Sequence, residues 1–119
     1  MRKIESAREA YETVRYVLEE EAKKKVVCIY LKEDGTLLGW NDQTENNAML
    51  SLASVVQANK VILVTNHPNG NSLPEQADIE QTIEIRELLG AVNIGLIDHI
   101  IIGYKEFYSY AEEKITFVK

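Results

Sequence analysis

The chain has 119 residues, which is enough for one domain with its own core and too few for a second module. Its composition, 45% hydrophobic and 27% charged, is typical of an ordinary globular protein. The formal net charge is −6, from 13 basic and 19 acidic residues, so the sequence disfavours a surface that follows nucleic-acid phosphates. With no long apolar stretch and no signal-peptide pattern, we expect a cytoplasmic protein that makes no membrane contact.

The first third of the chain predicts a helix and a β-hairpin. Apolar residues recur at spacings of three and four over residues 4–22, which predicts a helix with one apolar stripe. The β-branched run 26–31 predicts a strand. Asp34-Gly35 is a hairpin turn signal, and a second strand is expected at 36–40.

A second helix is predicted at 45–58, and a short, fully apolar strand at 61–64 has the pattern of a buried central strand. The inner face of that helix is expected to carry three apolar residues, Ala48, Leu52 and Val55. The apolar setting of Cys28 in the first strand indicates packing, and one cysteine excludes an internal disulfide.

The second half predicts a loop at 65–74, a helix from Pro74 to Gly90 and three strands. Proline suits the first turn of a helix, and glycine is a common stop. The strands are expected at 92–97, 99–103 and 115–118. This order of elements predicts an α/β fold in a single domain, with helices packed on a mixed sheet.

The segment 65–78 reads Thr-Asn-His-Pro-Asn-Gly-Asn-Ser-Leu-Pro-Glu-Gln-Ala-Asp and carries most of the functional information. A hydrolytic zinc ion needs about three protein ligands and an open position for water. His67 and Asp78 are residues of the right type, one after a strand and one in the first turn of a helix. Thr65 has a neutral hydroxyl, which is a poor zinc ligand.

This segment resembles the RadC-like branch of the JAMM (Jab/MPN) metalloprotease superfamily. That branch reads His-Asn-His-Pro-Ser-Gly and then Pro-Ser-x-x-Asp-x-x-x-Thr, which this chain matches at 65–70, 74–78 and Thr82. Two further family segments appear as Asp-His-Ile-Ile-Ile-Gly at 98–103 and Tyr-Ser-Tyr at 108–110. Spaced motifs in the right order make the resemblance specific.

The resemblance implies a JAMM/MPN-like, cytidine-deaminase-like mixed sheet packed with helices. Residues 1–119 are expected to form one such domain, with an N-terminal helix at 1–23 and the family-like core at 24–119. The resemblance also marks Asp98 and His99 as part of the scaffold, so we interpret them as structural.

In the family two histidines and an aspartate bind zinc, a glutamate acts as general base, and a serine assists. Carried over to this chain, His67 and Asp78 match two zinc ligands. Thr65 replaces the first histidine and Glu75 replaces the serine. The position of the base falls near Lys24. If the alignment is right, the side chains of His67 and Asp78 lie within about 6 Å of each other, since zinc–ligand bonds are roughly 2 Å long.

Three functions follow from these residues. The first is an inactive, protein-binding module with no resident cofactor, in which weak zinc binding and homodimer formation stay open. The second is a zinc peptidase or isopeptidase with a rearranged site of His67, Glu75 and Asp78, because zinc accepts carboxylate oxygens. The third is a module associated with DNA repair, which follows from the family alone and which the acidic charge disfavours.

Overall fold

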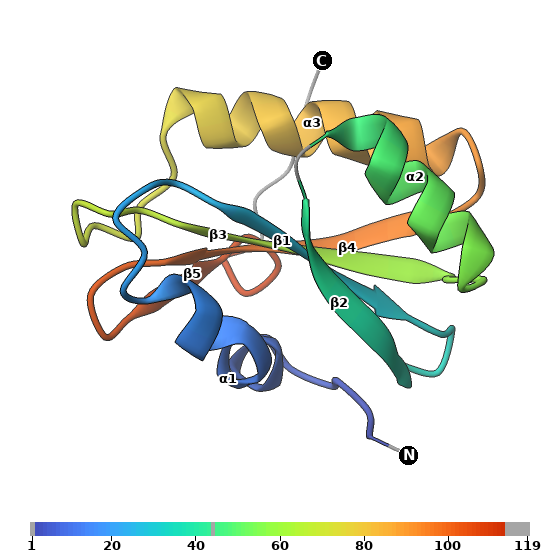
Figure 1. Cartoon of the computed structure of the whole chain (residues 1–119), viewed down its shortest axis with the longest axis horizontal. Coiled ribbons are helices and arrows are strands. Elements are labelled where there is room, and N and C mark those ends of the chain that lie inside the picture. Colours follow the sequence, from blue (N-terminus) through green and yellow to red (C-terminus); the bar gives the residue numbers. More distant parts are fainter. Residues whose placement is uncertain (1, 44, 114–119) are drawn as a thin grey trace.

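The computed structural model describes residues 2–43 and 45–113 and shows a mixed sheet between two layers of helices (Figure 1). The helices are α1 (Ala7–Leu18), α2 (Asn46–Val55) and α3 (Gln76–Gly90). The strands are β1 (Val26–Leu31), β2 (Leu37–Gln43), β3 (Lys60–Asn66), β4 (Gly95–Ile102) and β5 (Phe107–Ser109). Helix α1 covers one face of the sheet, and α2 and α3 cover the other. The predicted α/β class is confirmed.

The strand order is β2-β1-β3-β4-β5. Strand β1 runs antiparallel to both β2 and β3, whereas β3 and β4 are parallel and β4 and β5 antiparallel. The start of β1 therefore lies beside the end of β3, with Val26 opposite Thr65. This register brings residues just before β1 next to the loop that follows β3.

The face under α1 is built as the apolar stripe predicts. Ser6 caps the helix, since its hydroxyl accepts a hydrogen bond from the amide of Glu9 at 3.1 Å. The helix is shorter than predicted, and Ile4 reaches the core from the extended segment before it, where its amide donates to the carbonyl of Gly35. The buried members of this cluster on α1 are Ala10, Tyr11, Val14 and Leu18.

The predicted inner face of α2 is wrong. Val55 is 78% exposed, whereas Met49 and Ala53 are fully buried against the sheet. Met49, Ala53 and Val56 have the same spacing of four and three as the predicted set, so the apolar pattern fits two faces of this helix. Packing against the sheet and α3 selects one of them.

The second half contains two further corrections. Residues predicted as two strands form one strand, β4, and the short β5 that pairs with it was not predicted. The polar Asp98 does not interrupt β4, because its carboxylate accepts hydrogen bonds from Ser109 Oγ at 2.6 Å and the Ala111 amide at 3.0 Å. Helix α3 ends at Gly90 as predicted, but the left-handed residue is Asn93, with φ 62°. The strand predicted at 115–118 lies outside the described residues.

Among the described helices, none combines the length and the apolar character needed to cross a membrane. The Cys28 thiol is fully buried in β1, and desolvation raises its pKa to about 12, in keeping with the packing role predicted for it.

Candidate functional site

The site lies where β3 ends and α3 begins. The connecting loop is tight: Gly70 has φ 85°, and a Cβ on Gly103 of the neighbouring loop would come 2.5 Å from the Gly70 carbonyl oxygen. Asn69 does not take a positive φ; its side-chain oxygen instead accepts a hydrogen bond from the Asn71 amide at 2.9 Å. The segment that follows His67 is therefore held in a fixed shape.

His67 is buried and both ring nitrogens have partners. Nδ1 lies 2.7 Å from the carbonyl oxygen of Asn71, and Nε2 lies 2.7 Å from Oδ2 of Asp78. Both ring nitrogens are therefore engaged within the chain, one by a backbone carbonyl and one by a carboxylate. The two residues are thus as close as the motif alignment requires, and their role as metal ligands stays a prediction.

Asp78 is the centre of the site and is fully buried in the first turn of α3. Its Oδ2 also accepts a hydrogen bond from the Glu75 amide at 2.8 Å, which caps the helix. Its Oδ1 accepts a hydrogen bond from Lys24 Nζ at 2.7 Å. Burial by itself would raise the pKa of this carboxyl, but the hydrogen bonds and the nearby positive charges outweigh burial and lower the pKa. Asp78 is therefore an anion.

Lys24 is placed by the sheet register. It lies just before β1, and Asn66 at the end of β3 accepts a hydrogen bond from the Lys25 amide at 2.6 Å. The side-chain amide of Asn66 also donates to the Lys23 carbonyl at 3.0 Å. These two bonds fix the backbone on either side of Lys24, and its side chain, 36% exposed, reaches inward to Asp78.

Glu75 stands at the rim of the site. Its side chain is 59% exposed, and Oε1 lies 3.7 Å from His67 Nε2. One ligand atom from each of His67, Glu75 and Asp78 lies within 4.8 Å of the others, so the three residues form a group of the size that could hold a metal ion. The Glu75 carboxylate is thus near the side chains of His67 and Asp78.

The arrangement in the structure does not fit a zinc ion. Two ligands on a tetrahedral zinc with bonds of about 2.0 Å lie about 3.3 Å apart. His67 Nε2 and Asp78 Oδ2 are 2.7 Å apart, which is a hydrogen-bond distance. In addition, the ammonium of Lys24 already neutralises the other oxygen of Asp78. Zinc binding would require these groups to separate and the lysine to leave.

Thr65 takes part in a second buried network. Thr82 Oγ1 donates to the Asp78 carbonyl at 2.7 Å and can then accept from His99 Nδ1, 2.5 Å away. The other ring nitrogen, Nε2, accepts from Thr65 Oγ1 at 3.0 Å. Desolvation lowers the pKa of His99 to about 4, so this ring is neutral. The hydroxyl of Thr65 is therefore engaged in a hydrogen bond with His99. These buried contacts agree with the interpretation of His99 as a structural residue.

Sequence reasoning placed Lys24 near the lost base position but missed its ion pair with Asp78. The two residues are 54 positions apart, and the β1–β3 register brings them together with the turn that starts α3 after β3. The sequence carried one signal for this ion pair. A basic residue, Lys24, falls near the position of a family carboxylate, and Asp78 is an acidic residue expected in the same site. The contact between the Asn71 carbonyl and His67 had no sequence signal, because any residue supplies a carbonyl.

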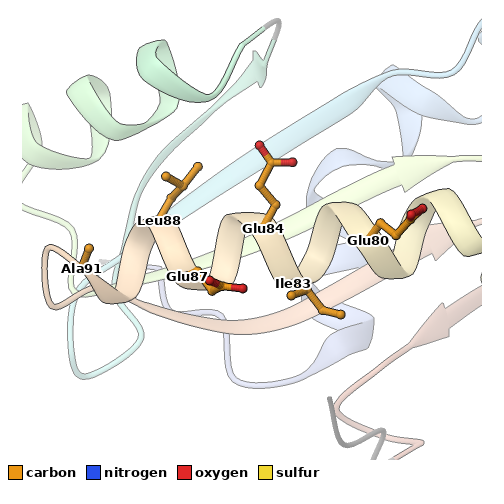
Figure 2. A pocket seen from close by; sticks show the side chains of 6 residues that line it. All are labelled: Glu80, Ile83, Glu84, Glu87, Leu88 and Ala91. Atoms are coloured by element: carbon orange, nitrogen blue, oxygen red, sulfur yellow. The ribbon is translucent and has the colours of Figure 1, made fainter. Parts of the chain in front are cut away.

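One hollow borders the site, and another lies on the outer side of α3. A cleft of about 270 Å³ borders His67 and is lined by the loop residues Pro68 and Gly70, together with Ile102 and Tyr104. A hollow of about 540 Å³ lies on the outer side of α3 and is lined by Glu80, Ile83, Glu84, Glu87, Leu88 and Ala91. Figure 2 shows Glu84 and Leu88 on one side of α3 and Ile83 on the other. The buried residues of α3 face the sheet, so this acidic hollow is separate from the site.

Comparison with known proteins agrees with the motifs. The model of the RadC-like JAB domain matches residues 4–115, a region that includes α1. A UPF0758 protein of Chlorobium phaeovibrioides is 31% identical over 120 residues, which cover 93% of this chain and 54% of that protein. A UPF0758 protein of Chlorobaculum parvum is 27% identical over 123 residues, covering 96% and 55%. One of Marinobacter nauticus is 48% identical over 52 residues, covering 44% and 23%. The chain spans about half the length of the first two relatives, and on these matches it belongs to the RadC-like JAB domain family.

Proposed function

We propose that this domain does not hydrolyse peptide or isopeptide bonds and that it binds a protein partner. The observation that carries the proposal is the contact of 2.7 Å between Lys24 Nζ and Asp78 Oδ1. A zinc hydrolase needs a metal ion that lowers the pKa of bound water to about 7 and a base that takes the proton. In this site an ammonium stands near the position at which the family resemblance expects the carboxylate base.

The remaining residues support the same proposal. Thr65 replaces a ligand, and its hydroxyl is bound to His99. His67 Nε2, the nitrogen that would face a metal, points at Asp78 as a hydrogen-bond donor. Every group that the family uses for catalysis is thus either replaced or already engaged in a contact within the chain.

The surface beside His67 supports a protein as the partner. The cleft is bordered by Tyr104, which is 68% exposed and lies between β4 and β5. Leu73, 59% exposed, lies on the other loop, between β3 and α3. Tyrosine is enriched among the residues that dominate binding between proteins. The acidic charge disfavours nucleic acid, as does the row of glutamates on the outer side of α3 (Figure 2).

An active hydrolase is the second candidate, and one observation favours it. His67, Glu75 and Asp78 offer three ligand atoms within 4.8 Å, and Glu75 is exposed enough to turn toward a metal. In that case the protein purifies with near-stoichiometric zinc, its activity is lost with a chelator, and Glu75→Ala removes both zinc and activity.

Metal analysis of the purified protein, with peptide and isopeptide substrates assayed with and without a chelator, separates the two. We expect neither bound zinc nor hydrolysis. Thr65→His should then restore zinc binding more than activity, and zinc binding only in part, because it replaces the ligand but leaves the Lys24 ammonium on Asp78. Thr65→His combined with Lys24→Glu supplies both ligand and base and is the variant in which chelator-sensitive hydrolysis is expected. Near-stoichiometric zinc or activity in the unmodified protein contradicts the proposal.

Partner binding is tested with Tyr104→Ala and the matched variant Tyr16→Ala. Tyr16 is 73% exposed on α1, is not among the residues that line the cleft, and packs against Trp40 of β2. Proteins that co-purify with the unmodified domain and with Tyr16→Ala, but not with Tyr104→Ala, bind at the cleft. Equal loss from both variants, or from neither, contradicts a partner at this surface.

A further inference from the structure

We propose that the Lys24 ammonium takes the structural place of the metal ion and keeps divalent cations out of the group formed by His67, Glu75 and Asp78. This inference deepens the proposed function, on which it rests, by assigning how the site is held together and closed to metal. It concerns a residue that the motif alignment marks only as a lost base.

The Asp78 carboxylate connects segments that a metal ion would otherwise join. A metal ion at this place would join the loop after β3 to the first turn of α3, through His67 and Asp78. The structure makes the same junction without an ion: His67 Nε2 binds one carboxylate oxygen of Asp78 and Lys24 Nζ binds the other, each at 2.7 Å. Lys24 adds the segment before β1 to this junction. One buried carboxylate thus links three segments of the chain.

The backbone around Lys24 is held in place before the ion pair forms. Lys24 does not reach Asp78 from a free loop, because Asn66 binds the backbone on both sides of it, at the Lys25 amide and the Lys23 carbonyl. Less backbone freedom is therefore lost when the ammonium binds Asp78. The position is built into the β1–β3 edge of the sheet.

The Lys24 ammonium also repels a divalent cation from Asp78. A divalent ion bound to Asp78 at about 2 Å would lie within a few ångströms of Lys24 Nζ, and like charges at that distance repel strongly in a partly buried site. The ion would also have to separate His67 Nε2 from Asp78 Oδ2, which are now hydrogen-bonded. Both costs disappear only when the lysine side chain leaves.

Lys24→Met is the direct test, because methionine keeps the unbranched apolar stem and removes the charge. Lys23→Met is the matched control, since it removes the same charge from the exposed neighbouring residue. Lys24→Arg retains a cation at the site. Zinc affinity is measured by titration calorimetry, and thermal unfolding is followed with and without zinc.

We expect Lys24→Met to bind zinc at least about tenfold more tightly than the unmodified protein, the scale on which neighbouring groups alter metal affinity. Without metal it should unfold at a lower temperature, and zinc should recover part of that loss. Lys23→Met and Lys24→Arg should bind zinc no better than the unmodified protein. Equal zinc affinity in Lys24→Met and Lys23→Met overturns the inference.

The unmodified protein supplies a test that does not depend on a variant that folds. Its unfolding temperature should be unchanged by zinc or by a chelator, and an increase with zinc overturns the inference. This outcome is distinct from failure of the proposed function, which is decided by hydrolysis and partner binding. If neither the unmodified protein nor Lys24→Met binds zinc, the inference fails while the non-catalytic proposal stands.

Discussion

The two faces of the sheet differ at one end. Under α1 the contacts are apolar: Ile62 and Val64 of β3 and Ile100 and Ile102 of β4 meet the stripe of the helix. The face under α2 and α3 also has an apolar core, which includes Leu63, Ile85 and Leu89. Near the start of α3, however, buried polar groups meet: His99 is hydrogen-bonded to Thr65 and Thr82, and Thr82 donates to the Asp78 carbonyl. Apolar packing depends on size and shape, whereas each polar contact requires one named partner.

The polar contacts gather at the candidate site. A buried polar group costs free energy unless its hydrogen bonds are complete, so each member of this network depends on its partners. The rest of the α3 face has an apolar core, and the network is confined to the end where α3 begins. Its residues Thr65, Asp78, Thr82 and His99 all lie in the motif segments of the sequence.

The largest expected effect is on the apolar face. Leu18→Ala should reduce the free energy of unfolding by about 2–5 kcal/mol, because it opens a cavity beneath α1 where Leu18 is fully buried. Urea denaturation monitored by circular dichroism measures the loss. Tyr16→Ala, on the exposed side of the same helix, should cost less than about 1 kcal/mol. A small effect of Leu18→Ala would mean that α1 is not part of the cooperative core.

The next effect is a dependence of stability on pH, and it comes from His99 in the buried polar network under α3. His99 has a folded pKa of about 4, below its ordinary value of 6.5, so between these values the unfolded chain binds more protons. Stability is therefore fully present above pH 6.5 and falls on the order of 3 kcal/mol as pH drops to 4. Burial raises the pKa of Asp98 and offsets part of the loss near the acidic end.

Denaturation at several pH values measures this dependence, and an NMR titration of the His99 ring assigns it. The ring should stay neutral until the pH approaches 4 or the protein unfolds. Protonation of the folded protein near pH 6.5 would contradict the buried, hydrogen-bonded ring described here.

A smaller effect on stability is expected from the ion pair between Lys24 and Asp78. The coupling between Lys24 and Asp78, from a double-mutant cycle with Lys24→Met and Asp78→Asn, should be about 1 kcal/mol. Asp78 is fully buried, but the Lys24 side chain is 36% exposed and solvent screens the pair. A coupling near zero would show that the ion pair does not contribute to stability.

The last prediction concerns the outer surfaces of the two helix layers. We expect no appreciable binding of DNA to them. On α1, Arg8 and Arg15 each form an ion pair with Glu12, so their charges are largely compensated. The net charge of −6 leaves little counterion-release free energy for duplex or single-stranded DNA. Fluorescence anisotropy at physiological salt is the measurement. Sub-micromolar binding that weakens steeply with added salt would contradict this expectation.

The sequence determined the parts of the fold whose signal is local. The apolar stripe of α1 and the β-branched run of β1 each depend on neighbouring residues, and the structure has β1 at the predicted residues 26–31. The motif around His67 and Asp78 identified the family, and the close approach of these two side chains followed from it. The inner face of α2 could not be predicted, because two sets of apolar residues share one spacing.

Only the tertiary structure decided the chemistry of the site. The family resemblance predicts that Thr65 stands at a ligand position and that Lys24 falls near the position of the base. It did not show that Lys24 binds Asp78 or that Thr65 binds His99. These pairs are 54 and 34 positions apart along the chain. The register of β1 on β3, and of β3 on β4, brings each pair within hydrogen-bond distance, and no local pattern of residues carries that register.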